Sequence, residues 1–87
     1  MGYLLRIKGS ARRELARIDK PQCERLIHAI DKLAVNPYRG SLLKGELSGL
    51  RRIRVGEYRV IYEIDGGKLT VLVVRVRHRR DAYRRSR

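Results

Sequence analysis

Apolar residues in the first part of the chain recur with the 3.6-residue period of an α-helix. Ala11, Leu15 and Ile18 are spaced by four and three residues, so they share one face of a helix. Ser10, directly before this series, has a side-chain oxygen that can cap the first helical turn. The preceding segment, Tyr3 to Ile7, is short and mostly apolar, which is typical of a strand. The chain is therefore expected to open with a strand followed by a helix.

A second helix is predicted to begin at Pro21, because a proline at the first helical position has no N–H group to leave unpaired. Its apolar stripe consists of Leu26, Ile27, Ile30, Leu33 and Ala34. Asn36 and Pro37 end it, since the residue before a proline avoids helical backbone angles. Very few residues separate the two helices, which predicts an antiparallel helical hairpin.

The second half of the chain changes to the two-residue alternation of strands. Strands are predicted over Arg52 to Val55, Tyr58 to Ile64 and Leu69 to Arg77, with tight turns at Gly56-Glu57 and Asp65-Gly66-Gly67. The unbroken apolar run from Val71 to Val74 is typical of a central strand buried on both faces. The segment from Tyr38 to Gly49 has three glycines and two serines and is expected to be a loop.

The predicted order is β-α-α-β-β-β. It gives one α+β domain over residues 1–87, with the helical hairpin packed on a mainly antiparallel four-stranded sheet. Cys23 is the only cysteine, so no intrachain disulfide is possible and a reducing compartment is expected. The N-terminal segment lacks the pattern of a secretory signal, and no stretch approaches the roughly 20 apolar residues of a membrane span. A cytoplasmic protein is expected.

Positive charge changes this picture of a plain α+β domain. The chain has 22 basic and 9 acidic residues, and 12 of the basic residues lie in the segment from Arg51 to Arg87, against four acidic ones. Alternation places Arg52 and Arg54 on one side of their strand, about 7 Å apart, and Arg59 on the neighbouring strand can join them. Near the end of the last strand the residues that alternate in the same way are Arg75, Arg77 and Arg79.

Rows of arginines on a folded sheet predict a binding site for a polyanion, because a guanidinium group matches phosphate oxygens in pairs. The alternative is an ordinary solvated face on which arginine stems cover apolar surface, although such a face usually mixes both signs of charge. Nucleic acid is the first candidate partner, an acidic protein segment the second and an anionic membrane surface the third.

Proton transfer at such a site needs a residue other than arginine, which stays protonated. His78 lies between two arginines and is the first candidate, with a purely structural histidine as the alternative. Tyr83 is expected either to stack on a nucleobase or hydrogen-bond a phosphate, or else to pack a C-terminal turn onto the sheet. Lys44 is a more remote candidate. No acidic residue of the basic cluster is expected to be placed to act as a carboxylate base, and neither a metal site nor a cofactor site is visible in the spacing of residues.

Two segments together resemble the RelE/ParE toxin superfamily of type II toxin–antitoxin systems. They are LLKGELSGLRRIRVGEYRVIYEI, from Leu42 to Ile64, and RVRHRRDAYR, from Arg75 to Arg84. The resemblance implies the microbial ribonuclease fold of RelE, with the same β-α-α-β-β-β order. It also implies a small endoribonuclease that cuts mRNA in the ribosomal A site by attack of a ribose 2′-OH on the adjacent phosphate.

The same resemblance implies residue roles. Arg52 and Arg54 match two basic strand positions, Arg59 matches an arginine that contacts the scissile phosphate, and Arg79 matches an arginine that stabilises transition-state charge. Tyr83 matches a tyrosine that orients the substrate, and His78 a position where relatives carry histidine. Lys44, Arg51, Arg75, Arg77 and Arg80 complete the expected RNA-binding surface. Arg52 and Arg54 replace lysines of well-known RelE members, one of which is thought to be the base, so His78 takes that role or catalysis depends mainly on charge stabilisation and positioning.

Membership in this superfamily would imply a cognate acidic antitoxin that covers the arginines, and mRNA on the ribosome as the target. Two alternatives stay open at the level of the sequence. A ParE-like toxin would share the fold but inhibit DNA gyrase by binding it. A non-catalytic relative would bind nucleic acid without cutting it.

Overall fold

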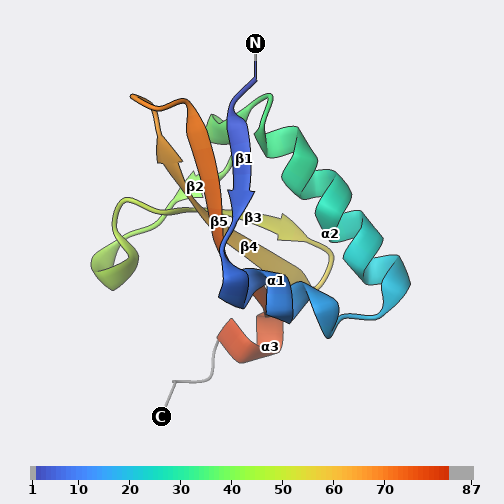
Figure 1. Ribbon diagram of the computed structural model, residues 1–87. Coiled ribbons are helices and arrows are strands. Elements are labelled where there is room, and N and C mark those ends of the chain that lie inside the picture. Colours follow the sequence, from blue (N-terminus) through green and yellow to red (C-terminus); the bar gives the residue numbers. More distant parts are fainter. Residues whose placement is uncertain (1, 83–87) are drawn as a thin grey trace.

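The computed structural model describes residues 2–82 of the chain. Its elements are β1 (Leu4–Ile7), α1 (Gly9–Ala16), α2 (Lys20–Leu33), the 3-10 turn η1 (Pro37–Arg39), β2 (Ser41–Leu42), the 3-10 turn η2 (Gly45–Leu47), β3 (Arg51–Val55), β4 (Tyr58–Asp65), β5 (Thr70–His78) and α3 (Arg79–Ala82) (Figure 1). In residues 2–82 no helix is long and apolar enough to cross a membrane.

The strands form one sheet in the order β1-β5-β4-β3-β2, with β1 parallel to β5 and the other neighbours antiparallel. The predicted α+β class is confirmed, but the sheet has five strands where four were expected. The additional strand is β2, which pairs Ser41 with Arg52 and Leu42 with Arg51. A strand of two residues is too short to show alternation, which is why the segment from Tyr38 to Gly49 was expected to be a loop throughout.

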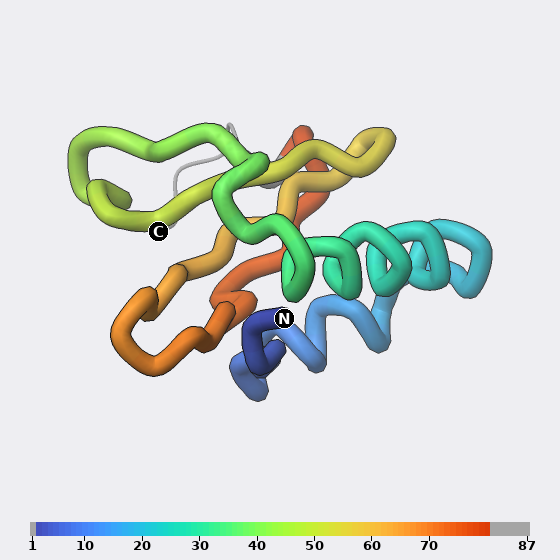
Figure 2. The backbone as a smooth tube through the Cα atoms, turned by 90° about the horizontal axis from the view of Figure 1, so that it is seen from above, coloured from blue at the N-terminus to red at the C-terminus, as the bar shows by residue number. Residues whose placement is uncertain are grey.

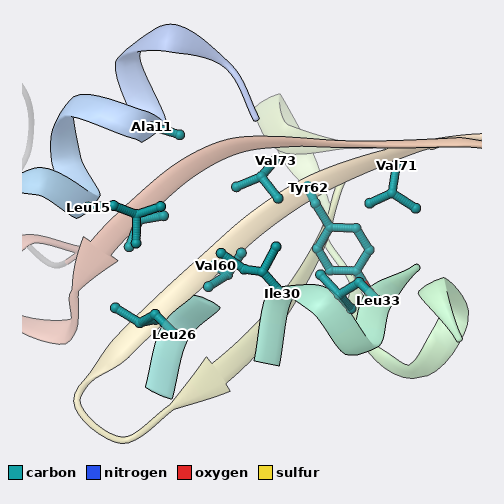
Figure 3. Close-up of a cluster of buried hydrophobic side chains, with 10 residues drawn as sticks. Ala11, Leu15, Leu26, Ile30, Leu33, Val60, Tyr62, Val71 and Val73 are labelled. Carbon is teal, nitrogen blue, oxygen red and sulfur yellow. The ribbon is translucent and has the colours of Figure 1, made fainter. Parts of the chain in front are cut away.

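Both long helices cover the same face of the sheet. The chain runs outward along α1 and returns along α2, as the predicted hairpin requires (Figure 2). The core between helices and sheet is made of Ala11, Leu15, Leu26, Ile30, Leu33, Val60, Tyr62, Val71, Val73 and Val76 (Figure 3). Of the predicted stripe on α2, Ile27 departs from this core, because 44% of it is exposed.

The helix starts differ from the predicted ones by one or two residues. Lys8 occupies the N-cap position of α1 without a side-chain hydrogen bond, so Ser10 lies inside the first helical turn rather than at its cap. Pro21 is the second residue of α2, which begins at Lys20. Proline fits there equally well, because the N–H groups of the whole first turn have no partner within the helix.

A β-bulge interrupts the alternation of β5. In the register with β4, Ile61 lies opposite Arg75 and Tyr62 lies opposite Val73, so Val74 is an extra residue without a partner. A bulge of this kind moves every following side chain of its strand to the other face of the sheet.

The bulge explains the unbroken apolar run from Val71 to Val74. Val71 and Val73 are buried before the bulge, and Val76 is buried after it, although strict alternation would turn Val76 outward. The expectation of burial on both faces was wrong, since Leu72 and Val74 are only half-buried. The apolar run therefore marks the point where the inward and outward alternation of β5 shifts by one residue. The strand is covered by helices on one face only.

Tyr62 fixes the segment before β2 to the sheet. Its ring lies in the core beside Leu33 (Figure 3), and its hydroxyl donates a hydrogen bond to the carbonyl oxygen of Pro37 over 2.6 Å. The hydroxyl oxygen of Tyr62 in turn accepts a hydrogen bond of 3.1 Å from the backbone N–H of Gly40. A Cβ atom at Gly40 would collide with this hydroxyl and lie 2.7 Å from the carbonyl oxygen of Arg52, so only glycine fits there.

Candidate nucleic-acid interface

The face of the sheet opposite the long helices carries two cross-strand rows of side chains. Arg54 lies opposite Arg59, and Arg59 lies opposite Arg77, which forms the first row across β3, β4 and β5. In the second row Ile61 separates Arg52 from Arg75. Neighbouring strands are about 4.8 Å apart, so five arginines share a surface a few strand spacings wide. We call this surface the arginine face.

A small pocket lies at the end of the first row, beside the turn between β3 and β4. Its volume is about 130 Å³, and it is lined by Arg54, Gly56, Glu57, Tyr58, Arg59 and Arg79. Arg79 reaches it from α3 rather than from the strand on which it was expected. The backbone N–H of Arg79 donates a hydrogen bond of 2.6 Å to the carbonyl oxygen of Glu57, which ties the start of α3 to this turn.

Glu57 is the functional candidate that sequence reasoning missed. One of its carboxylate oxygens lies 3.5 Å from Nη1 of Arg79, and both side chains are about three-fifths exposed, at 62% and 61%. An exposed ion pair of this kind is worth little to stability, so a phosphate can replace the carboxylate at Arg79. The sequence had predicted no acidic residue placed to act as a carboxylate base, whereas Glu57 lies beside Arg79 in the pocket.

The sequence did contain a signal for Glu57. The predicted turn at Gly56-Glu57 connects the two strands that carry Arg54 and Arg59, and a residue in that turn must lie at the end of their row. A carboxylate at this place can accept a proton from a substrate hydroxyl, which the surrounding arginines cannot do.

His78 lies on the other side of β5 from the arginine face. It is paired with Tyr58 in the sheet, and the two rings meet edge to face with their centres 5.1 Å apart. Its Nδ1 accepts a hydrogen bond of 3.1 Å from the backbone N–H of Arg80. With the Nδ1 lone pair occupied, the neutral imidazole carries its proton on Nε2, which can donate a hydrogen bond. To act as a base, His78 would have to release Arg80.

Known proteins resemble this chain over almost its whole length. A family model described as the ParE toxin of the type II toxin–antitoxin system parDE matches residues 5–83. Toxin RelG of Mycobacterium tuberculosis is 38% identical over 87 residues, which cover 98% of this chain and all of the relative. This chain belongs to the RelE/ParE toxin superfamily.

Solved structures of RelE/ParE toxins agree in fold with this toxin. The toxin–antitoxin complex RelBE2 from Mycobacterium tuberculosis contains a chain with a TM-score of 0.71 and 33% identity, covering 90% of this chain and 99% of that one. The archaeal RelE–RelB complex from Pyrococcus horikoshii gives a TM-score of 0.74 at 26% identity, covering 91% and 97% of the two chains.

The remaining predicted site residues of the toxin are distributed more widely. Arg51 lies on the helix-covered side, where its Nη1 donates to the carbonyl oxygen of Gly40 over 2.8 Å and its guanidinium group lies 5.1 Å from the centre of the Tyr38 ring. Lys44 is exposed in the segment before η2, and Arg80 is exposed on α3. The prediction for Tyr83 falls outside the described residues.

Arg51 therefore has a structural role, with hydrogen bonds to two backbone carbonyls, that sequence alternation alone does not reveal. Its neighbour Arg52 faces the opposite way, as period-two alternation requires. The hydrogen bonds of Arg51 hold the same segment that Tyr62 holds, between η1 and β2. Among the residues of the predicted site, the structure brings together Arg52, Arg54, Arg59, Arg75, Arg77 and Arg79 and leaves Lys44 and Arg51 apart from them.

Proposed function

We propose that this toxin is a ribosome-dependent endoribonuclease that cuts mRNA in the A site and thereby inhibits translation. The observation that carries the proposal is the pocket that Arg54, Arg59 and Arg79 line together with Glu57, whose carboxylate lies 3.5 Å from Arg79. Three guanidinium groups suit a phosphate whose negative charge grows during the reaction. The carboxylate supplies the proton acceptor that the arginines lack.

In the proposed reaction Glu57 accepts the proton of the ribose 2′-OH, and the 2′-oxygen forms a bond to the adjacent phosphorus. The bond from phosphorus to the 5′-oxygen of the next nucleotide breaks. That oxygen takes up a proton from solvent, and the products are a 2′,3′-cyclic phosphate and a 5′-OH. Arg59 and Arg79 hold the phosphate oxygens. No step of this sequence requires a metal ion.

Arg52 and Arg54 then have a binding role. Both keep their charge at every physiological pH, so neither replaces a lysine base. Their position on the arginine face, with Arg75 and Arg77, suits the backbone of a single RNA strand that leads into the pocket. Tyr83 lies outside the described residues and has no part in this assignment of the base and the phosphate ligands.

The toxin is further proposed to bind a cognate antitoxin with an acidic segment. Two similar chains are solved in complex with antitoxins, as RelBE2 and as RelE–RelB. The net charge of +13 makes an acidic, initially disordered segment a complementary partner. Such a segment over the arginine face would exclude RNA from it, and a ribosomal target places the toxin in the cytoplasm.

A second candidate function is inhibition of DNA gyrase. The matching family model is described as a ParE toxin, and the sequence already left a gyrase inhibitor open. That function needs a protein-binding surface and no acid–base pair. The pocket with Glu57 and Arg79 favours RNA cleavage over it.

Primer extension on a defined mRNA in a programmed translation reaction tests the proposal. Wild type is expected to cut within the A-site codon, and Arg79→Ala is expected to lose about 100-fold or more of that rate, because one charge stabiliser of the transition state is removed. Arg13→Ala, an exposed arginine of α1, is the matched control and is expected to cut like wild type. No cutting by wild type in a reaction where translation continues would refute the proposal, and a gyrase supercoiling assay would follow.

A further inference from the structure

The last part of β5 extends beyond its neighbour β1. The parallel pairing ends where Ile7 lies opposite Val73, and β5 continues to His78. An exposed strand edge leaves backbone groups without partners. Beyond the end of β1, α1 provides a partner for this edge. Oε1 of Glu14 accepts a hydrogen bond of 2.7 Å from the backbone N–H of Val76. Residues 14 and 76 are far apart in sequence, so this bond joins the first helix to the end of the last strand.

The other carboxylate oxygen of Glu14 is directed at an arginine of the arginine face. Oε2 lies 3.5 Å from Nε of Arg77, and both side chains are about one-third exposed. Nε of Arg77 is buried and has no hydrogen-bond partner among the residues that the structure describes. The ion pair with Glu14 is therefore the contact that compensates for its burial, and a half-buried pair is screened less than one at the surface.

Arg77 ends the first row of the arginine face, next to Arg59. Glu14 and Arg77 also line one depression of about 300 Å³ together with Arg17, Ile18, Tyr58, Val76 and His78. Arg79 follows two residues later in the chain, so the position of Val76 and Arg77 sets the point from which Arg79 reaches the pocket.

We propose that Glu14 is a positioning residue of the active site, an inference that rests on the proposed ribonuclease function. Its two oxygens hold the end of β5 and the side chain of Arg77 at the same time. Glu14 does not line the pocket beside Arg79, and it acts through Arg77. A displacement of about 1 Å in a catalytic group lowers a rate by up to about 100-fold, which makes a contact outside the pocket measurable.

Glu14→Gln is the informative variant, because glutamine keeps an oxygen acceptor for the Val76 N–H and removes the negative charge beside Arg77. The rate of ribosome-dependent cleavage is measured over a range of mRNA concentrations, so that kcat and KM are obtained separately. We expect kcat to fall about 5- to 20-fold, KM to stay within about twofold, and the melting temperature to stay within a few degrees. Glu24→Gln, an exposed residue of α2, removes the same charge and is expected to change neither constant.

A double-mutant cycle with Arg77→Gln decides whether Glu14 acts through Arg77. In the Arg77→Gln background, Glu14→Gln is expected to lower kcat by less than about twofold further, because its target is absent. If Glu14→Gln lowers kcat by the same factor in the Arg77→Gln background as in wild type, the inference is overturned. A lower KM with unchanged kcat would also overturn it, since that result describes a charge that only weakens RNA binding. A lower melting temperature with wild-type kinetics would show a purely structural contact.

The two hypotheses fail in different ways. If wild type does not cut mRNA in this reaction, the proposed function is wrong and the inference falls with it. If wild type cuts and Glu14→Gln cuts with the same kcat, only the inference is wrong.

Discussion

The two faces of the sheet are built from the same three strands and have opposite chemistry. Val60 and Tyr62 of β4 are fully buried beneath the helices, whereas Arg59, the neighbour of Val60, lies in the arginine face. Period-two alternation is enough to separate apolar from charged residues in β3 and β4. In β5 it is not enough, and the bulge at Val74 keeps the two sets on their proper faces. A polar site on a small sheet thus depends on backbone register as much as on residue type.

Glu57→Gln should separate binding from chemistry on the arginine face. Removal of the proposed general base is expected to lower cleavage by about 10² to 10⁴. RNA affinity should stay equal or increase, because the variant loses a negative charge beside Arg79. Glu63→Gln is the control, since Glu63 is an exposed acid on β4 outside the pocket. Cleavage by Glu57→Gln at the wild-type rate would exclude Glu57 as the base and return that role to His78.

Tyr62→Phe should affect the helix-covered face alone. The substitution leaves the carbonyl of Pro37 and the N–H of Gly40 without their buried partner, which costs about 1–3 kcal/mol of unfolding free energy. Chemical denaturation measures this loss. Cleavage by the folded variant at permissive temperature should remain within a few-fold of wild type, and a large loss of activity would show that the segment before β2 also orders the arginine face.

The same tyrosine gives stability a dependence on alkaline pH. Burial raises the pKa of Tyr62 above its ordinary value, mainly because the ionised form loses solvation, so the folded state holds this proton more tightly than the unfolded state. Its contribution is complete below the unfolded pKa of about 10 and is lost as pH rises above it. Wild type should therefore lose stability across that range more steeply than Tyr62→Phe.

Sequence reasoning recovered most of the fold because its signals are periodic. The helical stripe of α2 and the alternation in β3 and β4 each repeat several times, and errors there are limited to one or two residues at the ends. Alternation in β3 and β4 also gave Arg52, Arg54 and Arg59 of the arginine face, whereas the bulge in β5 puts Arg75 and Arg77 on it. The two-residue β2 and the bulge at Val74 have no repeat to reveal them, because each is defined by its partner strand.

The candidate site was recovered less completely, for a related reason. Contacts such as Glu57 with Arg79 and Glu14 with Arg77 join residues from different elements, and charge alone does not show which acid meets which arginine. Arg51 shows the opposite case. Its neighbours in the sequence suggested RNA binding, but in the folded chain its guanidinium group contacts the backbone carbonyls of Tyr38 and Gly40. Pairings of this kind need the tertiary structure.

Arg75→Gln should have the smallest effect and test the outer limit of the arginine face. Arg75 is exposed in the second row, away from the pocket, so its expected role is one phosphate contact without a part in chemistry. The slope of log affinity for single-stranded RNA against log salt should become shallower by about 0.7, the value for one contact. Arg12→Gln, an exposed arginine of α1, removes an equal charge from the opposite side and should leave the slope unchanged. Equal slopes for the two variants would mean that RNA affinity depends on the net charge of the protein. The arginine face would then not be a specific binding surface for the RNA strand.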